Sequence, residues 1–188
     1  MKLPKLAITL TACVLLFGCT SKSPQIQSSP IPTPSPSELT PTAGNTSLKS
    51  AVEELRMIQL KIKNGINEAG YSVLIAKTWP VVQKARGDAK ALAGVKSAFQ
   101  GHQLALKFWQ CDRVEGYHKL HQCRGQVLSA IFAKYPNLKT QAKAVVQSEK
   151  LSTISAKLDK EEILHRIWKE TSADIETAHQ MVSFVHSN

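Results

Sequence analysis

The chain of 188 residues lacks the sequence patterns that identify many enzyme classes. It contains no G-x-S-x-G nucleophile elbow, no C-x-x-C redox motif and no C-x-x-C-H haem attachment motif. No useful stretch alternates apolar and polar residues, so no strand is predicted, and no glycine-rich phosphate loop follows one. The sequence therefore predicts a non-enzymatic protein with no bound cofactor.

Proline is also scarce, but only after the first 47 residues. Six of the nine prolines lie between residues 20 and 47, and only Pro80 and Pro136 fall within residues 48–188. The proline-rich segment is otherwise mostly Ser, Thr and Gln, and it cannot bury enough apolar surface to offset its chain entropy. We expect residues 19–47 to form a disordered or extended linker and residues 48–188 to form one folded domain.

The N-terminal apolar segment is too short to cross a membrane. Residues 6–17 form an apolar run of twelve residues after Lys2 and Lys5, whereas a spanning helix needs about 20. A basic start, a short apolar run and a small residue before the cleavage point are typical of a secretory signal. We therefore expect residues 1–18 to be a cleaved signal peptide.

This segment ends in Leu16-Phe17-Gly18-Cys19. The stretch resembles the lipobox of prokaryotic membrane lipoprotein precursors, although Phe17 is bulkier than the residue usual at its position. The resemblance implies cleavage before Cys19, acylation of Cys19 by groups such as palmitate, and an extracytoplasmic, membrane-anchored protein. Thr20 in place of an aspartate favours the outer membrane if the host has one. The alternative is an ordinary signal peptide followed by a coincidental cysteine.

The folded domain is predicted to be all-α, an antiparallel bundle of about five to six helices. Apolar residues recur every three or four positions from Leu48 to Ile66, which indicates one face of a helix. Asp159 is the expected N-cap of the last helix, with Glu162 completing a capping box. The other helices are expected over residues 68–86, 89–111 and 117–134, with a weaker one from 138 to about 155.

Two cysteines remain for the domain if Cys13 leaves with the signal and Cys19 carries lipid. Cys111 and Cys123 would meet at a turn between two helices, in an oxidising compartment, so a disulfide is the leading interpretation. A metal site is the alternative, because Cys111, His118, His121 and Cys123 supply the ligand types of tetrahedral zinc.

The basic composition favours anionic partners. Without Lys2 and Lys5, 22 basic and 14 acidic residues give a net charge of about +8. The densest lysine stretch is Lys134, Lys139, Lys143 and Lys150.

Three functions are consistent with these features. The first is a non-enzymatic binding or accessory module that meets an anionic envelope component or an envelope protein. The second is a metal- or cofactor-binding helical protein using His102, His118 and His121. The third is a hydrolase with an unrecognised site. Nucleic acid is not an expected partner, because no nucleic-acid-binding module is recognised.

Overall fold

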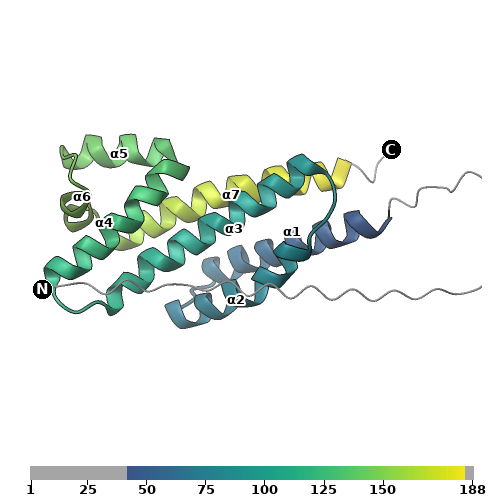
Figure 1. The fold of residues 1–188 in the computed structure, drawn as a ribbon, viewed down its shortest axis with the longest axis horizontal. Coiled ribbons are helices and arrows are strands. Elements are labelled where there is room, and N and C mark those ends of the chain that lie inside the picture. The colour runs from purple at the N-terminus through teal and green to yellow at the C-terminus, as the bar shows by residue number, and fades with distance from the viewer. Residues whose placement is uncertain (1–41, 185–188) are drawn as a thin grey trace, which may run out of the picture. The chain divides into compact units, whose positions relative to one another are not determined.

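The structure is a computed structural model that describes residues 42–184. This part of the chain forms seven α-helices, one short 3-10 helix and no strand, which confirms the all-α fold (Figure 1). The elements are α1 (Thr42–Lys63), α2 (Glu68–Lys84), α3 (Ala89–Gln110), η1 (Cys111–Arg113), α4 (Tyr117–Lys134), α5 (Pro136–Val146), α6 (Leu151–Lys157) and α7 (Lys160–Phe184). None of these helices is long and apolar enough to cross a membrane. Cys19, the signal peptide and most of the expected linker lie outside the described residues.

Polar side chains cap the N-termini of several helices. The Asn67 side chain accepts a hydrogen bond from the Gly70 backbone nitrogen at 2.8 Å. Asp88 caps α3 by accepting bonds from the first-turn backbone, and Asp159 caps α7 by accepting from the Glu162 nitrogen at 2.9 Å. Each cap satisfies a helix N-terminal N–H group that has no partner within its own helix.

Three boundaries differ from expectation. The first helix begins at Thr42, six residues before the Leu48 at which the helical spacing starts; Ser47 accepts a hydrogen bond from the Arg86 nitrogen at 2.9 Å, which ties this turn to the domain. Helix α2 runs through the exposed Pro80 and ends at Lys84, two residues before the expected end. The expected fifth helix is two helices, because Gln147 adopts a left-handed conformation (φ 54°) that ends α5.

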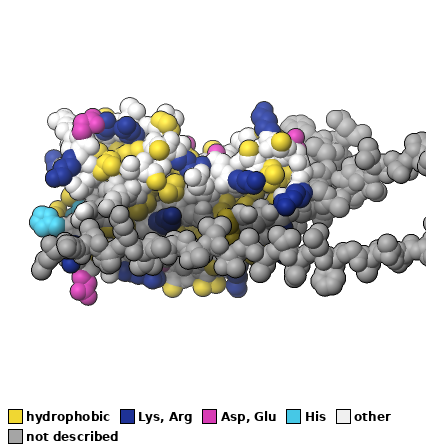
Figure 2. Space-filling model, in the orientation of Figure 1, with side chains coloured by type: hydrophobic (Ala, Val, Ile, Leu, Met, Phe, Trp, Pro, Cys, Tyr) yellow, Lys and Arg dark blue, Asp and Glu magenta, His cyan; other side chains and the backbone are white. Residues whose placement is uncertain are grey.

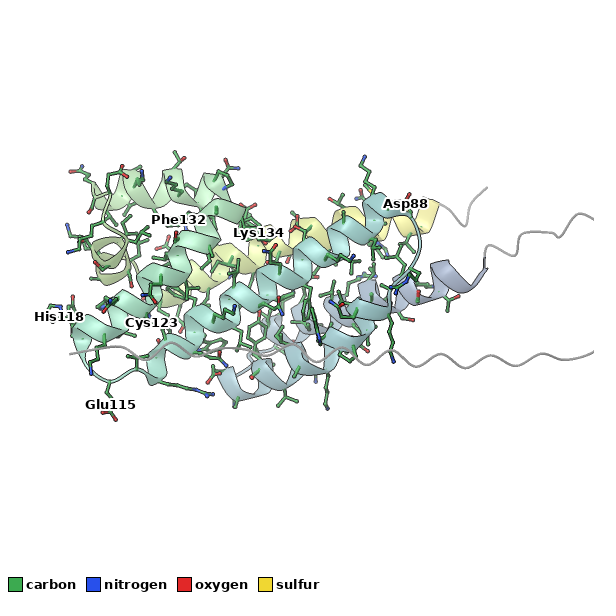
Figure 3. All side chains as sticks on the ribbon, viewed as in Figure 1. Asp88, Glu115, His118, Cys123, Phe132 and Lys134 are labelled. Atoms are coloured by element: carbon green, nitrogen blue, oxygen red, sulfur yellow. A yellow bond between two sulfur atoms is a disulfide. The ribbon has the colours of Figure 1, made fainter. Side chains whose placement is uncertain are left out.

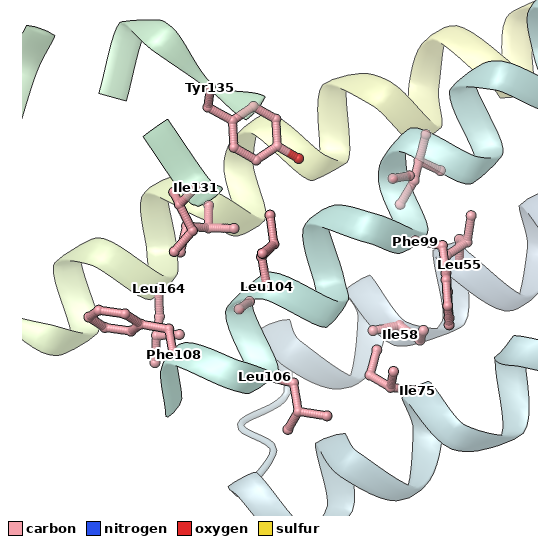
Figure 4. Close-up of a cluster of buried hydrophobic side chains, with 14 of the residues drawn as sticks. Leu55, Ile58, Ile75, Phe99, Leu104, Leu106, Phe108, Ile131, Tyr135 and Leu164 are labelled. Carbon is pink, nitrogen blue, oxygen red and sulfur yellow. The ribbon is translucent and has the colours of Figure 1, made fainter. Parts of the chain in front are cut away.

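Helices α3 and α7 pack antiparallel along the centre of the domain. Small residues permit their close approach: a Cβ atom on Gly94 would lie 3.2 Å from that of Ala178, and one on Gly101 would overlap the hydroxyl groups of Tyr135 and Thr171. Helices α1 and α2 cover one side of this pair, and α4 packs against α3. The apolar core is continuous across both sides (Figure 4).

A buried polar cluster interrupts this core where α2, α3 and α7 meet. The Tyr71 hydroxyl lies 2.8 Å from His102 Nδ1 and accepts a hydrogen bond from Trp168 Nε1 at 3.2 Å. His102 is fully buried, and its Nε2 atom has no hydrogen-bond partner among the described residues. Burial therefore lowers the pKa of His102 to about 3, because its charged form would lose both water and a second acceptor.

Candidate anion-binding groove

The turn between α3 and α4 is fixed by a disulfide. The Cys111 and Cys123 sulfur atoms are bonded, with their Cα atoms 5.8 Å apart, as the leading interpretation of the sequence expected (Figure 3). One residue further along α4, Arg124 forms an ion pair with Asp112 of η1, and its guanidinium lies 5.4 Å from the centre of the Phe108 ring. The start of α4 is therefore held against the end of α3 by covalent, ionic and aromatic contacts.

Helix α6 packs against the N-terminal half of α4, and an open groove of about 690 Å³ runs along the surface between them. Gly125 allows this packing, because its missing Cβ would lie 3.1 Å from the Ser152 backbone nitrogen. His121 Nδ1 lies 3.0 Å from the Ser155 hydroxyl, which links the two helices beside the groove.

The groove is lined by basic and neutral polar side chains and by Ala156, and no carboxylate is among its lining residues. Its basic members are His118 and His121 on α4, Lys157 on α6 and Lys150 just before α6. Both lysines are exposed, and neither forms an ion pair within the described chain. Hydrogen-bonding groups stand beside them: Gln122, Ser152, Thr153 and the Tyr117 hydroxyl.

Tyr117 organises the two histidines at the start of α4. Its ring meets the His121 ring edge-on at 4.4 Å and the His118 ring at 5.8 Å between centres. Figure 3 shows His118 at the outer end of this helix. Burial lowers the pKa of His121, and the nearby positive charges of Arg124 and His118 lower it further.

The groove is suited to binding an anion. Two lysines and two imidazoles supply positive charge or N–H donors, while the hydroxyl and amide groups supply further hydrogen bonds. Because α4 starts at this groove, its N-terminal dipole adds positive potential. The groove is open along its length, which would let it follow an extended anion as well as a small one.

The other lysines of the dense stretch do not line this groove. Of the dense lysine stretch, Lys134 donates to the Ser97 hydroxyl and faces Asp174, Lys143 pairs with Glu149, and only Lys150 lines the groove. Figure 2 shows Lys and Arg side chains spread over the visible face of the domain rather than gathered in one patch. The sequence contained no signal that Lys150 and Lys157 would meet His118 and His121.

The structure does not bring together the three histidines named for a metal site. His118 and His121 line the groove, whereas His102 lies inside the core on α3. Within the described residues, no three His, Cys, Asp or Glu side chains are grouped so that they could hold a metal ion. The thiols of Cys111 and Cys123 are used by their disulfide.

Comparison of the chain with protein-family models, with curated proteins and with solved structures gives no match. The groove and the N-terminal sequence are the features of this chain that bear on its function.

Proposed function

We propose that this chain is a lipid-anchored, extracytoplasmic binding module of the cell envelope that holds an anionic envelope component in the α4–α6 groove. The observation that carries the proposal is the lining of the groove, where four basic side chains meet and no carboxylate opposes them. Anions attracted to such a surface gain both charge pairing and charge-assisted hydrogen bonds. The module binds its ligand without transforming it.

The N-terminal sequence supports the location. Leu16-Phe17-Gly18-Cys19 resembles a lipobox, and the proline-rich segment that follows would serve as a spacer between a lipidated Cys19 and the helical domain. A second acyl chain on Cys19 would make the anchor stable, since one chain binds a membrane only marginally. A tethered module of this kind samples a layer of the envelope next to its membrane.

The anchor is tested by metabolic labelling with palmitate. The unaltered chain should incorporate label and stay in the membrane fraction, whereas Cys19→Ala should do neither. Cys13→Ala is the matched control, because Cys13 lies within the expected signal peptide. Labelling that survives Cys19→Ala would overturn the anchor.

The ligand class is tested with the full chain in mild detergent. We expect binding to short polyphosphate, and none to uncharged dextran of similar length. Binding should weaken as salt rises from 0.05 to 0.5 M, because exposed charges are then screened over shorter distances. Equal binding to charged and uncharged probes would contradict the proposal.

A further inference from the structure

A second cavity lies between α4, α5 and α7, and it shares no lining residue with the groove. Its walls are mainly apolar: Leu128 and Phe132 come from α4, Leu138 and Ala142 from α5, and Ile163 from α7. Its volume is about 70 Å³. Since one water occupies about 10–15 Å³ of such space, the cavity has room for about five to seven non-hydrogen atoms.

The neighbouring surface of α5 is also apolar and incompletely covered. Val145, which lines the cavity, is 71% exposed and is the most exposed of the large apolar side chains in the described chain. Figure 2 shows apolar side chains reaching the surface over α4 and α5. The cavity is thus accessible from solvent and can receive one branched aliphatic or phenyl group.

A polar network stands at the mouth of the cavity. Arg166 donates from Nε and Nη2 to Glu162 Oε1, at 3.0 and 2.5 Å, and from Nη1 to the Gln141 side-chain oxygen. All three residues line both the cavity and an outer hollow of about 330 Å³. The outer hollow is also lined by Leu138, His165, Lys169 and Glu170.

The outer hollow presents equal numbers of positive and negative side chains with unused bonding capacity. Arg166 uses three of its five N–H donors, and Glu162 Oε2 accepts no hydrogen bond within the described chain. Lys169 and Glu170 form no ion pair there either. A ligand that complements this hollow therefore carries one positive and one negative charge.

We propose that the cavity and outer hollow together bind a free apolar α-amino acid, such as leucine or phenylalanine. The side chain enters the apolar cavity, which matches it in size. The α-carboxylate meets Arg166 and Lys169, and the α-ammonium meets Glu162 and Glu170. This ligand is uncharged overall, so the site is independent of the anion-binding groove.

The test is calorimetric titration of the full chain in mild detergent with a matched ligand series. Leucine and phenylalanine should bind, and glycine should bind about ten- to hundredfold more weakly, because it buries no side chain. Leucinamide and N-acetylleucine, which each lack one charge, should bind at least about tenfold more weakly than leucine. Absence of leucine binding would overturn the proposal, as would octanoate binding as tightly as leucine.

Two pairs of variants locate the site. Ala142→Leu fills the cavity and should abolish leucine binding, whereas Ala144→Leu adds the same atoms on the exposed side of α5 and should not. Arg166→Gln should weaken leucine binding at least about tenfold, and Lys139→Gln, an exposed charge change on α5, should not. If Ala142→Leu fails to fold, the charge pair decides, and equal effects within that pair would refute the site.

Discussion

Acid should destabilise this domain through one buried histidine. His102 is fully buried, its Nδ1 faces the Tyr71 hydroxyl, and its Nε2 has no partner among the described residues. The folded protein therefore holds His102 neutral, while the unfolded chain protonates it at an ordinary pKa near 6.5. Below that pH the unfolded state binds up to one more proton than the folded state. The free energy of unfolding therefore decreases as the pH is lowered.

The magnitude follows from the depressed pKa of His102, which lies near 3 in the folded domain. Between its unfolded and folded pKa values, each pH unit costs about 1.4 kcal/mol, so acidification from pH 7 to 4.5 should remove about 2.5 kcal/mol. That is a large part of the 5–15 kcal/mol that is usual for a domain. The loss should be complete only near pH 3.

The assay is urea unfolding at pH 7, 6, 5 and 4.5 for the unaltered chain and for His102→Gln. His102→Gln removes the titrating group. Between pH 7 and 4.5 its free energy of unfolding should therefore decrease by about 2.5 kcal/mol less than that of the unaltered chain. His165→Gln, which removes an exposed imidazole on α7, is the control and should behave like the unaltered chain. Parallel pH profiles for the unaltered chain and His102→Gln would refute the reasoning.

Three further outcomes are expected. Gly101→Ala should lower stability by about 1–3 kcal/mol in urea unfolding, because the new Cβ would overlap the hydroxyl groups of Tyr135 and Thr171; unchanged stability would show that these neighbours move aside without cost. Replacing Cys111 and Cys123 by serine should cost about 3 kcal/mol in the same assay, and no loss would argue against the disulfide. Anion affinity should rise as the pH falls below about 6.5, because His121 gains charge only below its lowered pKa; a fall measured by titration calorimetry would exclude it from the site.

Local signals in the sequence predicted much of the fold. The range 117–134 is confirmed for α4, because a glycine precedes it and Pro136 follows it. Asp159 caps the helix that it was expected to cap. The break between α5 and α6 was missed because Gln147, neither glycine nor proline, takes the left-handed conformation.

The candidate groove was much harder to predict, because it depends on tertiary packing. His118 and His121 stood out in the sequence as neighbours on one helix face, yet their interpretation as metal ligands depended on which residues would join them. Lys150 and Lys157 join them only because the break after α5 turns α6 back onto α4, at the height of Gly125. His102, grouped with them from the sequence, lies in the core instead.

The central claim is that the α4–α6 groove, rather than net charge, binds the anion. The most direct measurement compares polyphosphate affinity of two equally charged double variants by titration calorimetry. Lys150→Gln with Lys157→Gln empties the groove of its lysines, and at about 1 kcal/mol per charge it should weaken binding about 30-fold. Lys77→Gln with Lys84→Gln, on exposed positions of α2, should change affinity by less than about threefold. Equal losses in both double variants would contradict the account.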